Sequence, residues 1–139
     1  MASILVVNGR NQGEWYTVGQ RTMVFGRDDE LLAEILDPCV SRRHLEVRFD
    51  TRDQCYYAVD TNSHNGVRVN GQRIQGFKAL ADEDAVRIGH TLLVFTFTEF
   101  VDDRNAQAFL KQSQQKHRDT IDALVQEKRE RIEKTLHST

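Results

Sequence analysis

Short runs of apolar residues dominate the first hundred residues of the chain, and several of them alternate strictly with polar residues. Every second residue is apolar from Leu45 to Phe49, and Val67 to Val69 repeats the pattern. A period of two places alternate side chains on opposite faces of a strand, one towards a core and one towards water. We therefore predict strands at residues 4–7, 15–18, 23–25, 45–49, 56–59, 67–69, 86–88 and 92–97. Many short strands of this kind are typical of a β-sandwich or barrel.

The connections between these runs contain turn-forming residues. Asn8-Gly9, Asn65-Gly66 and Asn70-Gly71 each place an asparagine before a glycine, and both residue types reach positive φ readily. Hairpin reversals are expected at some of these pairs. Residues 28–40 differ, because leucines and isoleucine fall at helical spacing until Pro38 ends the pattern. We expect a long loop or a single helical turn there.

The composition changes abruptly after Val101. Residues 102–139 contain no glycine or proline and are rich in helix-favouring residues, with Asp102 and Asp103 available to cap the start. We predict two units, an all-β unit at residues 1–101 and a C-terminal helical extension at residues 102–139. The apolar stripe of this helix is interrupted, which favours packing on the sandwich or forming a homodimer over a free coiled coil. A link to a different partner stays open.

Charge and cysteine content narrow the range of functions. The chain has 19 basic and 21 acidic residues, whereas a duplex-binding domain normally has a basic excess that neutralises phosphates. Nucleic-acid binding is therefore not expected. Cys39 and Cys55 match no zinc-binding spacing, so we expect no metal and no other cofactor. The sequence has neither a signal peptide nor an apolar stretch of about 20 residues, so a cytoplasmic location without membrane binding is predicted.

Three segments far apart in the sequence combine turn-forming residues with hydrogen-bond donors. They are residues 26–27, 41–44 and 60–66. Strand ends on one side of a sandwich lie close together, so donors from separate loops can converge on a single anion. Phosphate suits such a site, because a guanidinium can donate two parallel bonds to its oxygens and a hydroxyl can donate one.

The order and spacing of these segments resemble the forkhead-associated (FHA) domain family, whose β-sandwich modules read phosphothreonine peptides. The similarity covers about residues 3–100. Its motifs are Gly26-Arg27, Asp37-Pro38 with Ser41-Arg42-Arg43-His44, Asp60 with Ser63, Asn65 and Gly66, Val69-Asn70-Gly71, and Val86-Arg87-Ile88-Gly89. The resemblance implies an all-β, FHA-type sandwich of about eleven strands, followed here by the C-terminal α-helix.

The resemblance also implies a role for individual residues. It assigns Arg27, Ser41 and Arg42 to the phosphate and Asn65 to the peptide backbone beside the phosphorylated residue. The neighbouring Arg43 is a further candidate for a peptide contact. Five residues are expected to hold the loops in place instead of touching ligand: Gly26, His44, Asp60, Ser63 and Gly66. The expected partner is a phosphothreonine-containing protein in Ser/Thr kinase signalling.

One position departs from the family pattern. His64 stands before Asn65, where FHA domains often have a hydroxyl-bearing residue that contacts phosphate. Two interpretations stay open. The imidazole donates an N–H to the phosphate, with binding strongest at roughly pH 6 to 7, or His64 is an exposed loop residue without a role in binding.

Two other functions compete with phosphopeptide binding. Catalysis would need an activated nucleophile, and Ser41, His44 and Asp60 are the only candidates for a triad. No glycine-framed nucleophile turn surrounds this serine, so an enzyme is not expected. The other alternative is a phosphate-independent assembly scaffold that uses the sandwich and the C-terminal helix. The main support for a scaffold is His64, which stands in place of a hydroxyl-bearing residue. The presence of Arg27, Ser41 and Arg42 argues against this alternative.

Overall fold

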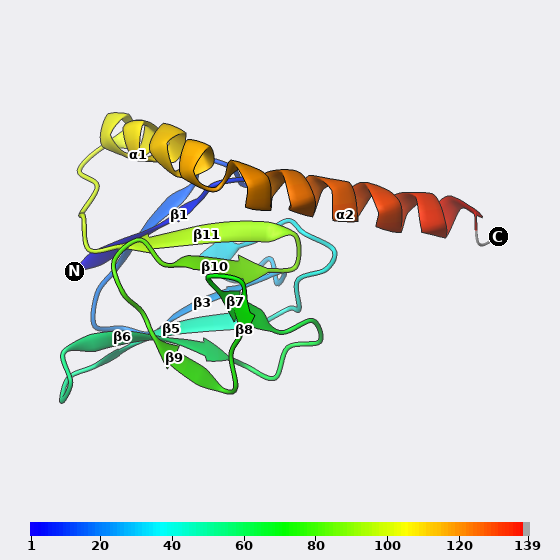
Figure 1. Cartoon of the computed structure of the whole chain (residues 1–139). Helices are drawn as coiled ribbons and strands as arrows, with labels where there is room; N and C mark the ends of the chain where they lie inside the picture. Colours follow the sequence, from blue (N-terminus) through cyan, green and yellow to red (C-terminus); the bar gives the residue numbers. More distant parts are fainter. Residues whose placement is uncertain (138–139) are drawn as a thin grey trace.

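Two β-sheets packed face to face form the body of the protein in the computed structural model, which describes residues 1–137 (Figure 1). The six-stranded sheet has the order β2-β1-β11-β10-β7-β8 and contains β1 (Ala2–Val6), β2 (Trp15–Val18), β7 (Val67–Val69), β8 (Gln72–Arg73), β10 (Ala85–Ile88) and β11 (Thr91–Thr96). The five-stranded sheet has the order β4-β3-β5-β6-β9 and contains β3 (Met23–Gly26), β4 (Ala33–Glu34), β5 (Leu45–Asp50), β6 (Cys55–Asp60) and β9 (Phe77–Ala79). The expected sandwich of about eleven strands is confirmed.

The main core lies between the two sheets and contains the inward faces of the alternating strands. Leu45 and Val47 of β5 are buried, whereas Arg48 between Val47 and Phe49 is exposed. Aromatic rings join the two layers, because Tyr56 of β6 lies 5.5 Å from Phe95 of β11 between ring centroids. Burying these faces supplies the main driving force for the sandwich.

Residues 28–40 contain the short strand β4 where a helical turn was one of two expectations. β4 pairs in parallel with β3, and the N–H of Ile35 donates to the carbonyl of Gly26 at 2.7 Å. This pairing gives backbone N–H and C=O groups of the segment hydrogen-bond partners that a helical turn would otherwise have supplied. Leu32 is 84% exposed, so the helical spacing of its apolar neighbours does not mark a buried helix face.

The asparagine-glycine pairs form different kinds of connection. Asn70 and Gly71 have φ values of 50° and 85° and join the paired strands β7 and β8, so this reversal is a hairpin. Asn65-Gly66 instead joins β6 to β7, which belong to different sheets. That segment therefore crosses the end of the sandwich.

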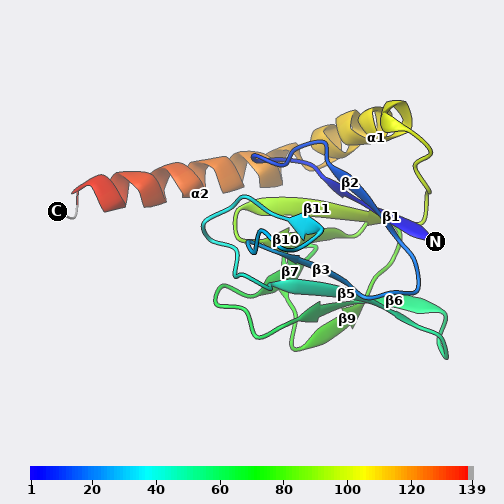
Figure 2. The ribbon, with the colours of Figure 1, turned by 180° about the vertical axis from the view of Figure 1, so that it is seen from behind.

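The C-terminal extension is divided into α1 (Asp103–Lys116) and α2 (Arg118–His137). The side chain of Asp102 caps α1 by accepting the N–H of Asn105 at 3.0 Å. Both helices run across the outer face of the six-stranded sheet (Figures 1 and 2). They form a second apolar cluster with it: Leu5, Val7, Ala85, Leu92, Val94, Phe100, Ala106 and Leu124. The extension therefore packs on its own sandwich.

The second half of α2 continues past the end of β11, on the side where the β10–β11 turn lies (Figure 1). Leu124 is 2% exposed and marks the last buried position of the helix among the described residues. No helix within residues 1–137 is long and apolar enough to cross a membrane.

We predict that Leu124→Ala lowers the free energy of unfolding by about 2–3 kcal/mol, because it leaves a cavity between α2 and the sheet. Val125→Ala is the matched control, since that side chain is 42% exposed and its truncation should change stability by under about 1 kcal/mol. Chemical denaturation followed by circular dichroism measures both values. Equal losses in the two variants would contradict the docked position of α2.

Candidate functional site

The end of β3 lies directly against the β4–β5 loop, and this contact positions Arg27. A Cβ atom on Gly26 would lie 2.1 Å from the carbonyl oxygen of Arg42, so only glycine allows this approach. Two backbone bonds extend the contact. The N–H of Arg27 donates to the carbonyl of Ser41 at 3.0 Å, and the N–H of Asp28 donates to that of Arg42 at 3.1 Å. Arg27 therefore lies beside Ser41 and Arg42.

The guanidinium of Arg27 is oriented but not neutralised. Its Nε donates to the carbonyl of Val40 at 3.1 Å, which leaves the two terminal nitrogens for other partners. The residue is exposed, and no ion pair within residues 1–137 involves it. The nearby Arg42 side chain is 73% exposed and lies 3.8 Å from the carboxylate of Asp28. Two guanidinium groups are thus accessible to an anion from solvent.

The β6–β7 loop meets the β4–β5 loop through side-chain bonds to backbone. The hydroxyl oxygen of Ser41 accepts the N–H of His64 at 3.0 Å, and the hydroxyl keeps its own proton to donate. The side-chain nitrogen of Asn65 donates to the carbonyl of Cys39 at 2.8 Å, which leaves its carboxamide oxygen without a protein partner among the described residues. We refer to Arg27, Ser41, Arg42, His64 and Asn65 together as the rim.

His44 is buried beneath the rim and links its two main loops. Its Nδ1 accepts the N–H of Ser41 at 2.9 Å, and its Nε2 lies 2.7 Å from the carbonyl oxygen of Gly66. Because a backbone N–H can only donate, Nδ1 must be unprotonated and Nε2 must carry the proton. Burial lowers the pKa of His44, and the hydrogen bond to Gly66 offsets part of this effect.

The bonds of His44 bear on the triad that the sequence offered. Both ring nitrogens are bonded to backbone groups, so neither is directed at the hydroxyl of Ser41. The carboxylate of Asp60 is likewise bonded within its own loop, where it accepts both the N–H and the hydroxyl of Ser63 at 2.9 and 2.7 Å. Ser41, His44 and Asp60 therefore do not form the nucleophile, base and orienting acid of a hydrolase.

Ser63 and Gly66 complete the fold of the β6–β7 loop. The hydroxyl oxygen of Ser63 accepts the N–H of Gly66 at 3.1 Å. Gly66 has a φ of 79°, and a Cβ atom there would lie 2.6 Å from the Nε of Arg73. The positive φ therefore favours glycine at this position, and the guanidinium of Arg73 in β8 lies directly against it.

Arg43 lies next to the rim with an exposed side chain. The carbonyl of Arg43 accepts a hydrogen bond from the hydroxyl of Thr61. The sequence predicted neither this contact nor the ion pair between Asp28 and Arg42. A short polar side chain at the start of a loop is a recognisable signal for such bonds. Asp37, a residue of the family motif without a predicted role, joins the β4–β5 loop to the β10–β11 turn. Its carboxylate accepts the N–H groups of Cys39 and His90, both at 2.8 Å.

The FHA domain family matches residues 23–89, which include β3 and all of the rim. A solved structure from work on phosphothreonine-dependent FHA domain interactions superposes with a TM-score of 0.62 and 29% identity, covering 71% of this chain and 98% of that one. The chain belongs to the FHA domain family.

Two of the relatives with similar sequences come from mycobacteria. The FHA domain-containing protein FhaA of Mycobacterium tuberculosis is 37% identical over 82 residues, which cover 59% of this chain and 15% of FhaA. The glycogen accumulation regulator GarA of Mycolicibacterium smegmatis is 34% identical over 107 residues, which cover 77% of this chain and 66% of GarA. The chain thus spans a small part of FhaA and about two thirds of GarA.

We predict that stability falls as the solution is acidified below about pH 6.5, because the unfolded chain then binds a proton that neutral His44 in the folded state excludes. The contribution of His44 is complete above the unfolded-state pKa and is lost as the pH falls towards the lower folded-state pKa. An NMR titration of the ring nitrogens should show a His44 pKa below 6.5 and a proton on Nε2. A proton on Nδ1, or a raised pKa, would contradict the bonds described here.

Proposed function

We propose that this FHA domain is a phosphothreonine-dependent protein-binding module in Ser/Thr kinase signalling, with its phosphate held by Arg27, Ser41 and Arg42. The observation that carries this proposal is the backbone pairing of Arg27 with Ser41, which holds a guanidinium and a hydroxyl side by side. The structural similarity to FHA domains with phosphothreonine-dependent interactions supports the same ligand. Residues 1–101 form the recognition module, and residues 102–139 extend it.

The peptide would bind by hydrogen bonding and charge, with no bond made or broken. Each charge-assisted bond to phosphate contributes about 1.5–3 kcal/mol. The carboxamide oxygen of Asn65 accepts a peptide N–H beside the phosphothreonine, and Arg43 contacts a flanking residue. The occupied nitrogens of His44 support a non-catalytic role. The free thiols Cys39 and Cys55 agree with a cytoplasmic location.

The loops of the rim are joined to one another before any ligand binds, through Ser41, His44 and Asn65. A preformed site loses little conformational freedom on binding, so more of the phosphate interaction appears as affinity. A short peptide buries little surface beyond its phosphate, and we expect a micromolar dissociation constant, about −8 kcal/mol. A methyl recess for threonine would favour it over serine by about 1 kcal/mol.

Arg27→Ala should weaken binding of a phosphothreonine peptide by roughly 10- to 100-fold, because both terminal nitrogens of the guanidinium are lost. Arg27→Lys should not restore affinity, since an ammonium cannot reproduce the bond to Val40 and a two-nitrogen contact to phosphate together. Arg52→Ala, in the exposed β5–β6 turn, is the matched control. Isothermal titration with a peptide selected from a phosphothreonine library measures the affinities.

The same measurements would also identify a phosphate-independent function. If phosphorylated and unphosphorylated peptides bind alike, and Arg27→Ala changes neither affinity, the domain is a phosphate-independent scaffold.

We assign the exposed ring of His64 a supplementary N–H bond to the phosphate. The backbone of His64 is already fixed to Ser41, so His64→Ala removes the ring and keeps that bond. His64→Ala should therefore weaken binding of a phosphothreonine peptide several-fold at a fixed pH, because one hydrogen bond to the phosphate is lost. Equal affinities of the wild type and His64→Ala would leave the ring without a role.

A further inference from the structure

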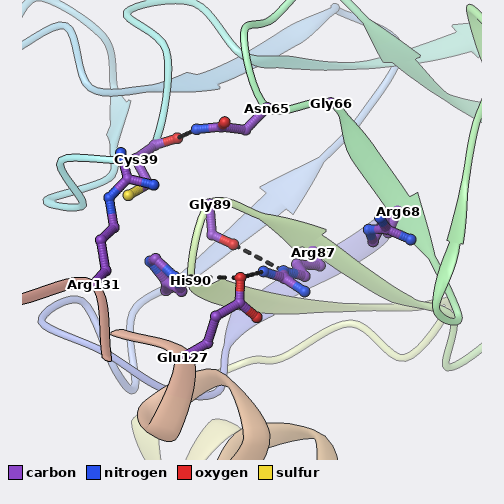
Figure 3. Close-up of a pocket in the computed structure, with 9 residues that line it drawn as sticks. All are labelled: Cys39, Asn65, Gly66, Arg68, Arg87, Gly89, His90, Glu127 and Arg131. Atoms are coloured by element: carbon purple, nitrogen blue, oxygen red, sulfur yellow. Dashed lines mark hydrogen bonds and ion pairs between the residues drawn. The ribbon is translucent and has the colours of Figure 1, made fainter. Parts of the chain in front are cut away.

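A pocket of about 300 Å³ opens beside the rim, between the sandwich and α2 (Figure 3). Cys39 and Asn65 form the side of the pocket that faces the rim, and the side chain of Asn65 donates a hydrogen bond to the carbonyl of Cys39. Ser41 follows Cys39 by two residues, so their Cα atoms lie within about 7 Å. A ligand group in the pocket would therefore be a close neighbour of a phosphate bound at Ser41.

The helix α2 contributes two residues to this pocket, Glu127 and Arg131. They are four residues apart, which places both side chains on one face of the helix. The carboxylate of Glu127 accepts a bond from Nη2 of Arg87 at 2.9 Å, and this bond fixes the helix face against β10. Figure 3 shows the side chain of Arg131 extending from α2 towards Cys39. Arg131 lies outside residues 23–89, so the family domain alone does not supply it.

The pocket has an excess of positive charge. Arg68, Arg87 and Arg131 line it, and Glu127 is its one carboxylate. Arg87 is bonded to Glu127 and to the carbonyl of Gly89, whereas no hydrogen bond or ion pair within residues 1–137 holds the guanidinium of Arg131. One exposed cation therefore faces the pocket without a partner, and an anion would meet a net attraction there.

We infer that α2 completes a second anion subsite at this pocket. The subsite would select partners that have a second negative group, a carboxylate or a second phosphate, within about four residues of the phosphothreonine. An extended peptide rises about 3.3 Å per residue, so such a residue can reach a subsite next to the rim. The inference rests on the proposed function and deepens it, because it makes the helical extension part of the recognition surface.

The test uses the full chain and phosphothreonine peptides of one base sequence with neutral flanks. An aspartate is placed in turn at each of the four positions on either side of the phosphothreonine, and a phosphoserine then replaces the best aspartate. Fluorescence anisotropy should show a several-fold gain in affinity at one or two positions. Arg131→Glu should abolish this gain and lower affinity for the acidic peptide about tenfold. The phosphoserine peptides show whether carboxylate or phosphate is preferred.

Arg129→Glu is the matched control, because it makes the same charge change on the same exposed helix. Its position two residues away turns the side chain about 200° around the helix, where it lines a different pocket. On the neutral peptide, the two variants should bind within about twofold of each other. Glu127→Gln should strengthen binding of the acidic peptide, since it removes the one carboxylate. Equal behaviour of Arg131→Glu and Arg129→Glu on every peptide would overturn the subsite.

Unphosphorylated versions of the same peptides, and the variant Arg27→Ala, separate this inference from the proposed function. Phosphothreonine dependence without any preference for acidic flanks would overturn the subsite and keep the proposed function. An acidic preference that depends on Arg131 but not on the phosphothreonine would keep the subsite and overturn the proposed function.

Discussion

A buried imidazole whose two nitrogens are both bonded to backbone is the connection on which the rim depends. His44 accepts from Ser41 in one loop and donates to Gly66 in another, so a single side chain fixes the separation of the two loops. The bond from Asn65 to Cys39 and the close approach of Gly26 to Arg42 then extend the same arrangement. Protonation of His44 would replace an accepting nitrogen with a donor facing the N–H of Ser41. The neutral ring is thus a requirement of the geometry.

A second buried group extends this framework towards α2. The carboxylate of Asp37 accepts from Cys39 and from both His90 and Thr91 in the β10–β11 turn. That turn lies beneath α2, where the ring of His90 is 3.7 Å from the carboxylate of Glu127. The rim, the β10–β11 turn and the helix are therefore connected by short polar contacts through the end of the sandwich. This continuity connects the helical extension to the rim, and it supports the proposed second subsite at α2.

The sequence predicted the elements whose signal is local. Strands such as β5 alternate over several residues, and Asp102 is a local cap for α1. The strands β8 and β9 were not predicted, because each has two or three exposed residues and forms only by pairing with a longer neighbour. The division of the helix at His117 also has no glycine or proline to mark it. It is visible only from the backbone.

The candidate site was likewise predicted where the sequence has a recognisable motif, and not where tertiary contacts decide. The resemblance assigned four residues to the ligand, and these lie together at the rim: Arg27, Ser41, Arg42 and Asn65. The carbonyl groups that orient them, such as those of Val40 and Cys39, could not be predicted because any residue supplies a carbonyl. Arg131 was not predicted, because its place in the pocket that Asn65 also lines depends on how α2 docks on the sheet, which no local pattern encodes.

An NMR titration of ¹⁵N-labelled protein with a phosphothreonine peptide tests the central claim most directly, because it locates the anion on the molecule. The account predicts that the Nε–H signal of Arg27 and the amide signals of Ser41, Arg42 and His64 shift most, and that the unphosphorylated peptide leaves them in place. Largest shifts at the β5–β6 turn, or equal shifts with both peptides, would contradict it.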